Sequence, residues 1–170
     1  MRSVILSLLD GATRRVFLSV SVICVAMLAF GLYLQYVGNL EPCPMCIVQR
    51  YAMVAVAVSA ALAGASGRKS LQISGAVLML ASAGFGAFVA ARQSWLQWYP
   101  PQVATCGRDF YGMIESFPLS RAIPMIFSGS GDCSAVEWRF LGGSIANWAL
   151  LAFTGFAIVA VLMIWRKARR

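Results

Sequence analysis

The sequence predicts an all-α membrane protein, a bundle of four transmembrane helices with one long loop outside the cytoplasm. Its 170 residues are 60% hydrophobic and only 12% charged, whereas a soluble domain carries about 25% charged residues. A helix needs roughly 20 apolar residues to cross a bilayer. Four runs are long enough, namely Val16–Val37, Ile47–Ser66, Leu71–Ala91 and Ile145–Trp165. We therefore expect a single integral membrane domain over residues 1–170.

The placement of basic residues predicts how the four spans are oriented. The net charge is +8, and most of the basic residues border the same ends of the spans: Arg2, Arg14, Arg15, Arg68, Lys69, Arg166, Lys167, Arg169 and Arg170. Positively charged flanks stay in the cytoplasm. Both termini are then cytoplasmic and the loops 38–46 and 92–144 lie on the far side. The basic residues are therefore accounted for by the orientation of the spans in the membrane, and we expect no nucleic-acid partner.

The 92–144 segment begins with an aromatic collar and continues as an interrupted apolar stretch. Trp95 and Trp98 favour the headgroup level of a membrane, and the pair Pro100-Pro101 ends the helix. Residues 110–127 are rich in apolar side chains, but two prolines prevent one long helix. We expect short helices lying on the membrane surface.

The most informative motif is Pro42-Cys43-Pro44-Met45-Cys46 at the start of the second span. Two thiols at this spacing can form a small disulfide that is readily reduced and re-formed. Arg50 lies four residues after Cys46, on the same face of a helix. Its charge and the helix N-terminus would both stabilise a Cys46 thiolate. The alternative is that Arg50 only snorkels to the interface or pairs with Glu41.

We expect different roles for the three other cysteines. Cys24 lies in the middle of the first span, where a small buried apolar role is expected. Cys106 and Cys133 lie in the long loop, where a bridge could staple the chain and contribute about 3–4 kcal/mol. Because Cys43 and Cys46 face the same oxidising side, exchange between two pairs is favoured over a staple.

The sequence argues against a metal site and against chemistry that needs histidine. A zinc site usually takes two closely spaced cysteine pairs, and only Cys43 and Cys46 are close in sequence. The chain has no histidine, which excludes His-ligated haem and any Cys-His or Ser-His dyad within it. We expect no metal.

Several motifs in order give the chain a family resemblance. They are Pro42-Cys43-Pro44-Met45-Cys46 followed by Arg50, Tyr99-Pro100 with Ala104-Thr105-Cys106, and Ser130-Gly131-Asp132-Cys133 with Trp138 and Phe140-Leu141-Gly142. Together they resemble the disulfide bond formation protein B (DsbB) family of bacterial inner-membrane thiol oxidases. One departure is Gln93, near a position where some relatives carry a histidine, so any role of that histidine in a quinone site cannot be carried over.

The resemblance implies a protein-disulfide:quinone oxidoreductase in the bacterial inner membrane. A soluble, periplasmic, thioredoxin-like oxidant of the DsbA type would give its electrons to a Cys106–Cys133 disulfide. Cys133 would then attack Cys43, leaving Cys46 as a thiolate beside a bound quinone, either ubiquinone or menaquinone. Arg50 would stabilise that thiolate and the reduced quinone oxygen, and the lipid bilayer is the remaining partner.

Two other functional classes of protein remain possible from the sequence. A related family member could oxidise a dedicated partner, or work in the reductive direction as vitamin K epoxide reductases do. The chain could also be a non-enzymatic membrane scaffold held by structural disulfides. Quinone reduction by the purified protein separates the scaffold from the enzymes, and a screen of thioredoxin-like partners separates the relatives.

The orientation can be tested with a thiol reagent that does not cross membranes. On reduced spheroplasts the reagent should label Cys43, Cys46, Cys106 and Cys133, because the charge bias puts both of their loops outside the cytoplasm. Mass spectrometry of the labelled protein checks the sites. Labelling that required disruption of the inner membrane would contradict both the orientation and the oxidase interpretation.

Overall fold

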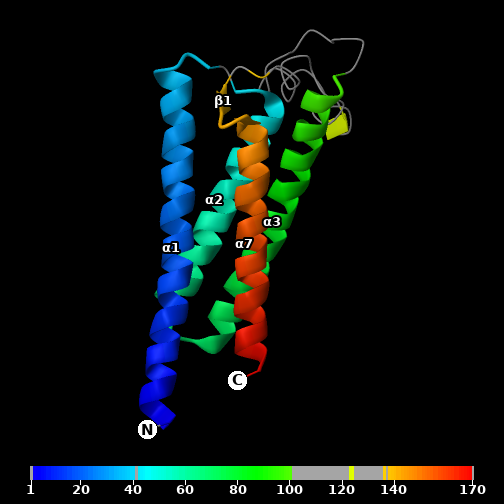
Figure 1. Ribbon diagram of the computed structural model, residues 1–170. Coiled ribbons are helices and arrows are strands. Elements are labelled where there is room, and N and C mark those ends of the chain that lie inside the picture. Colours follow the sequence, from blue (N-terminus) through cyan, green and yellow to red (C-terminus); the bar gives the residue numbers. More distant parts are fainter. Residues whose placement is uncertain (1, 41, 101–122, 125–135, 137, 170) are drawn as a thin grey trace.

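The computed structural model contains four long helices whose order follows the predicted spans (Figure 1). It describes residues 2–40, 42–100, 123–124, 136 and 138–169, and of residues 2–11 the backbone alone. The long helices are α1 (Arg2–Tyr36), α2 (Pro44–Ala65), α3 (Lys69–Trp98) and α7 (Ile145–Ala168). Within the described part of the chain, all four are long and apolar enough to cross a membrane. The predicted fold class, a helical membrane bundle, is confirmed.

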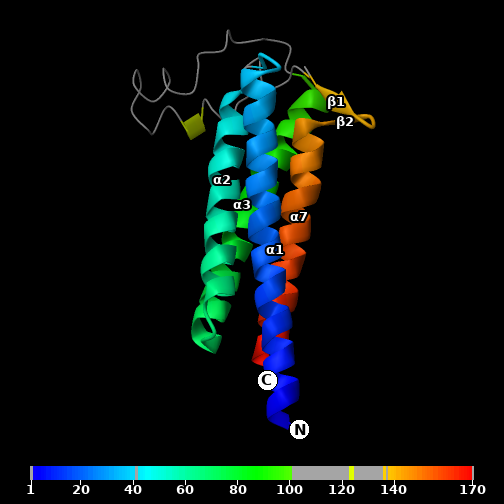
Figure 2. The same ribbon diagram turned by 90° about the vertical axis from the view of Figure 1, so that its left-hand side faces the viewer.

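The four helices pack in the order in which they occur in the sequence, with α2 and α3 in the middle. α1 packs mainly on α2, α2 packs on α3, and α3 packs on α7. Both termini lie at the same end of the bundle as the short connection from α2 to α3 (Figures 1 and 2). The start of α2 and the end of α3 lie at the opposite end, which we call the outer end. The Cys-x-x-Cys motif is therefore far from the termini.

The helices extend past several ends of the predicted apolar runs. α2 begins at Pro44, before the predicted start at Ile47, so Cys46 lies inside its first turn. α3 continues past Ala91 to Trp98 and so carries the tryptophan collar. The rings of Trp95 and Tyr99 are in contact at a tilt of 35°, with centroids 4.8 Å apart. The surface helices predicted for residues 110–127 fall almost wholly outside the described residues.

Small residues allow the middle of the bundle to pack closely. Membrane helices gain little from the hydrophobic effect between one another and rely on tight contact instead. The core contains many buried alanines, and its larger side chains Phe17, Met79 and Phe153 are completely buried. Gly86 faces the ring of Phe153, and Gly75 faces Ala63 and the carbonyl oxygen of Ser59. Apolar side chains on the outer faces, including Val22, Val58 and Leu151, are exposed, as expected for side chains in contact with lipid.

Arginine side chains join α1 to α2 near both ends of the pair. At the terminal end, Arg14 Nε donates to the carbonyl oxygen of Gly64 at 2.9 Å, and Nη2 donates to that of Ala65 at 3.4 Å. These carbonyls belong to the last turn of α2, which has no intrahelical donors for them. Arg50, near the outer end, makes the corresponding contact from α2 to α1, as described below.

A short hairpin precedes α7 and was not predicted from the sequence. Strand β1 (Arg139–Phe140) pairs antiparallel with β2 (Gly143–Ser144), so that Phe140 lies opposite Gly143. The two residues of the turn, Leu141 and Gly142, have φ angles of 49° and 81°. Positive φ at both central positions is typical of tight hairpin turns.

The close contact between α2 and α3 can be tested with two glycines of α3. A Cβ at Gly75 would lie 2.7 Å from the Ala63 Cβ and 3.0 Å from the Ser59 carbonyl oxygen, whereas a Cβ at Gly84 meets nothing within 4 Å. Gly75→Ala should therefore lower the free energy of unfolding by about 1–3 kcal/mol. Gly84→Ala should change it by at most about 1 kcal/mol, in the stabilising direction. Detergent unfolding in mixed micelles measures both, and equal stability of the two variants would rule out the close packing.

Candidate active site

The Cys43 side chain caps the start of α2. Cys43 has extended backbone angles, φ −63° and ψ 159°, and its sulfur accepts the backbone N–H of Cys46 at 3.3 Å. Pro44 occupies the first turn, where its missing N–H costs nothing. The two sulfur atoms lie 2.7 Å apart, so the pair is placed for disulfide chemistry. The helix N-terminus favours negative charge at this position.

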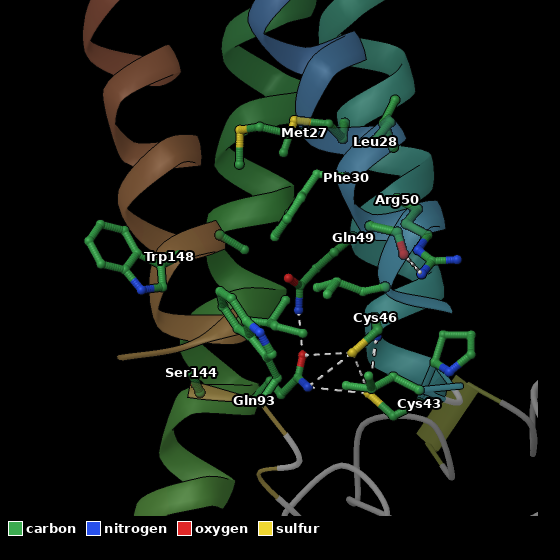
Figure 3. A pocket seen from close by; sticks show the side chains of 18 of the residues that line it. Met27, Leu28, Phe30, Cys43, Cys46, Gln49, Arg50, Gln93, Ser144 and Trp148 are labelled. Atoms are coloured by element: carbon green, nitrogen blue, oxygen red, sulfur yellow. Dashed lines mark hydrogen bonds between the residues drawn. The ribbon is translucent and has the colours of Figure 1, made fainter. Parts of the chain in front are cut away.

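Two glutamines, one on α2 and one on α3, link these sulfurs to α3 through hydrogen bonds. Gln93 Nε2 donates to Cys43 Sγ at 3.2 Å and to Cys46 Sγ at 3.3 Å. Gln49 Nε2, from α2, donates to Gln93 Oε1 at 2.6 Å. Both glutamines are buried, with 3% of Gln93 and 6% of Gln49 exposed. Figure 3 shows the resulting set of hydrogen bonds linking Gln49, Gln93 and both cysteines.

The Arg50 guanidinium is directed toward α1. Its Nη1 donates to Gln35 Oε1 at 2.5 Å, and its Nη2 donates to the carbonyl oxygen of Gly31 at 3.2 Å. Arg50 and Cys46 lie on the same face of α2 and border the same cavity. The sequence predicted the shared face, but it did not predict that the guanidinium would be anchored to α1 (Figure 3).

A cavity of about 1000 Å³ opens beside the sulfurs at the outer end of the bundle. Side chains of α1, α2, α3 and α7 line it, together with residues of the hairpin. Its wall is largely apolar and aromatic, with Met27, Phe30 and Trp148 as representative residues. The polar groups that border it include Cys46, Arg50 and Gln93. A mostly apolar cavity with a few fixed polar groups is the usual form of a small-molecule site.

The hairpin and α3 build the other side of this cavity. Ser144 Oγ donates to Gln97 Oε1 at 2.6 Å and accepts the backbone N–H of Asn147 at 3.3 Å, which caps α7. Trp148 Nε1 donates to the carbonyl oxygen of Phe140 at 3.0 Å. The rings of Phe30, Trp138 and Phe140 follow one another with centroids 5.9 and 6.0 Å apart. This aromatic wall brings α1 and the hairpin together.

The predicted site residues fall into two groups. Cys43, Cys46 and Arg50 all border the cavity. Cys106 and Cys133 lie outside the described residues, so their role stays a prediction. Cys24 is completely buried in the core formed by the helices. Within the described part of the chain, no three or more His, Cys, Asp or Glu residues are grouped so that they could hold a metal ion.

Sequence reasoning missed the roles of Gln49 and Gln93. The available signal was their polarity, because a buried amide within an apolar span requires a hydrogen-bond partner. That signal marks the two residues as important, but it does not identify their partners.

Comparison with known proteins shows the family of this chain. A family model described as "Disulfide bond formation protein DsbB" matches residues 13–163. The chain belongs to the DsbB family. It is 67% identical to disulfide bond formation protein B of Albidiferax ferrireducens over 162 residues, covering 95% of this chain and 93% of that protein. It is 64% identical to the Acidovorax sp. (strain JS42) protein of the same name, covering 96% and 94% of the two chains.

Membership in the DsbB family connects the cysteine pair with disulfide bond formation. More distant relatives, such as the disulfide bond formation protein B of Azoarcus sp. (strain BH72), are 49% identical and cover 92% of this chain. The family resemblance predicted from the motifs is confirmed. The chain is a multi-pass membrane protein with a role in disulfide bond formation, and the family supports a disulfide oxidoreductase.

Proposed function

We propose that this protein re-oxidises a periplasmic, DsbA-like dithiol oxidase and delivers the electrons to a membrane quinone. The observation that carries the proposal is the position of the Cys43 and Cys46 sulfurs at the wall of a large apolar cavity that Arg50 also borders. A redox-active pair at such a site can exchange electrons with a lipid-soluble molecule. The pair also lies at the outer end of the bundle, where a protein partner can approach.

The cavity fits a quinone ring in chemistry and in size. Small-molecule sites commonly have volumes of about 300–1000 Å³, and this cavity has about 1000 Å³. Phe30 and Trp148 offer flat apolar surfaces, and the Arg50 guanidinium offers N–H donors for a carbonyl oxygen. Ubiquinone or menaquinone, when bound, supplies the acceptor of two electrons and two protons.

The proposed relay uses four cysteines in two pairs. A thiolate of the partner attacks Cys106 and breaks a Cys106–Cys133 disulfide, and the second partner thiol then releases the partner in its oxidised form. The Cys133 thiolate attacks Cys43, breaks the Cys43–Cys46 disulfide and leaves Cys46 as a thiolate. Cys106 resolves the Cys43–Cys133 bridge and restores the loop disulfide. Each cycle moves two electrons from the partner's dithiol to the Cys43–Cys46 pair, and the two protons released by the partner complete the balance.

The reduced pair is held where its charge is tolerated. The α2 N-terminus stabilises an anion at Cys46 by about 0.3–1 kcal/mol, and by up to about 2 kcal/mol in a partly buried site. Arg50 contributes a fixed positive charge at the same cavity. Both terms favour the thiolate, which is the reactive form of a cysteine.

The location follows from the same proposal. In the bacterial inner membrane, both termini would lie in the cytoplasm and the loops 38–46 and 92–144 in the periplasm. The common position of the two termini, opposite the Cys-x-x-Cys motif, is consistent with this orientation (Figure 1).

Cysteine variants test the division of labour in the relay. Cys43→Ser and Cys46→Ser should abolish quinone reduction with any thiol donor, and Cys106→Ser and Cys133→Ser should abolish turnover with a protein dithiol. Cys24→Ser should keep near-normal activity, because Cys24 is buried among the helices in a different cluster from Cys43 and Cys46. Quinone absorbance with a reduced thioredoxin-like partner measures the rates. An inactive but well-expressed Cys24→Ser variant would contradict the assignment of Cys24 to packing, and quinone reduction without Cys46 would contradict the relay.

Arg50 variants test the proposed quinone site. Arg50→Ala should weaken apparent quinone affinity about ten- to hundred-fold, because a charge-assisted hydrogen bond contributes about 1.5–3 kcal/mol. Arg50→Lys should rescue only partly, because lysine lacks the planar fork that can bind Gln35 and a second acceptor together.

The matched control is Arg14→Ala. Arg14 also joins α1 to α2, but at the far end of the pair, so its loss should lower stability and leave quinone affinity unchanged. Quinone titration at matched protein levels compares the three variants. Unchanged affinity in both Arg50 variants would remove Arg50 from the site, and equal rescue by lysine would support simple snorkelling.

A further inference from the structure

The amide of Gln93, on α3, donates hydrogen bonds to both reactive sulfurs. Its Nε2 lies 3.2 Å from Cys43 Sγ and 3.3 Å from Cys46 Sγ. We infer that Gln93 is a catalytic residue that stabilises the reduced cysteine pair through its two N–H groups, and that Gln49 is the residue that orients it. The inference rests on the proposed function, in which Cys46 must become a thiolate.

Gln49 determines which end of the Gln93 amide meets the sulfurs. A carboxamide has an acceptor oxygen at one end and two N–H donors at the other. Gln49 Nε2 donates to Gln93 Oε1 at 2.6 Å, which directs this oxygen toward Gln49 on α2. With Gln49 in this orientation, turning the Gln93 amide over would bring two NH₂ groups together and break this bond. The favoured orientation therefore presents the donors to Cys43 and Cys46, as Figure 3 shows.

The same amide can serve both protonation states of Cys46. A Cys46 thiol can donate to Gln93 Oε1, which lies 3.8 Å away. A Cys46 thiolate can accept from Nε2 at 3.3 Å instead. Because Gln93 is only 3% exposed, water competes little for these bonds, and hydrogen bonds are stronger in such surroundings.

Within the described residues, the hydrogen bonds of Arg50 do not reach the sulfurs. Its hydrogen bonds go to Gln35 and Gly31 of α1, whereas those of Gln93 go to the sulfurs. A neutral donor also avoids the cost of burying a second charge beside Arg50. The arrangement thus gives the sulfurs a fixed donor and leaves the guanidinium to act at the cavity.

The experiment measures thiolate reactivity in quinone-free, fully reduced protein in detergent. Iodoacetamide is added at neutral pH to the full chain carrying Cys106→Ser and Cys133→Ser, and fragment-ion mass spectrometry follows each remaining sulfur. Gln93→Leu should slow alkylation of Cys46 roughly three- to ten-fold, because a charge-assisted hydrogen bond is lost while the intrinsic nucleophilicity of the thiolate rises slightly. The ultraviolet absorbance of the thiolate should fall in parallel.

Two further variants separate orientation from simple burial. Gln49→Leu should slow alkylation less than Gln93→Leu, and the double variant should be no slower than Gln93→Leu alone, because Gln49 acts only through Gln93. The control is Gln72→Leu, a second buried glutamine of α3 that donates to the Ser66 carbonyl oxygen far from the sulfurs. It should leave Cys46 alkylation unchanged.

The outcomes separate this inference from the proposed function. Wild-type alkylation rates in Gln93→Leu would overturn the role of Gln93, and additive effects in the double variant would overturn the role of Gln49. If Gln93→Leu does not fold, slowed alkylation in Gln49→Leu still supports the inference and an unchanged rate overturns it. Since no quinone or partner is present, a protein that fails to reduce quinone but passes these tests would contradict the proposed function alone.

Discussion

The outer end of the bundle depends on hydrogen bonds from one helix to the caps of two others. Cys43 caps α2 and Ser144 caps α7, each by accepting a backbone N–H of the first turn. Gln93 and Gln97, four residues apart on α3, bind these two capping side chains. Residues at this spacing share a helix face. One face of α3 therefore fixes both helix starts, and the reactive sulfurs are placed by the same contacts that close the bundle.

α1 is held differently, and this difference shapes the cavity. It packs mainly on α2, and arginine contacts join the pair near both ends, through Arg14 and Arg50. Away from the ends, the bundle relies on small side chains that allow close approach. Because α1 has its main packing against α2 and α7 has its main packing against α3, their outer halves can border an open volume. The apolar wall contributed by α1 and α7 follows from this arrangement.

The fold followed from the sequence because the membrane restricts the choice of structure. Long apolar runs must be helical, since each backbone polar group needs a partner inside the segment. The Cys-x-x-Cys motif and the relation of Arg50 to Cys46 were also readable, because both are local. The contacts of Gln93 with the sulfurs join positions 50 and 47 residues apart in the sequence, so no local pattern encodes them. The hairpin was missed because Leu141 gives no sign that it adopts a positive φ.

The site thus combines a charged group, Arg50, and a neutral group, Gln93, which bind different parts of the site. A half-buried charge is stabilised by hydrogen bonds, and Arg50 obtains these from Gln35 and the Gly31 carbonyl oxygen. That anchoring holds the guanidinium at the α1 side of the cavity. Gln93 needs no such compensation beyond one bond from Gln49, so its donors are available to the sulfurs. A disulfide has no charge to stabilise, whereas a thiolate does, and a fixed neutral donor therefore favours the reduced pair selectively without placing another charge in the membrane.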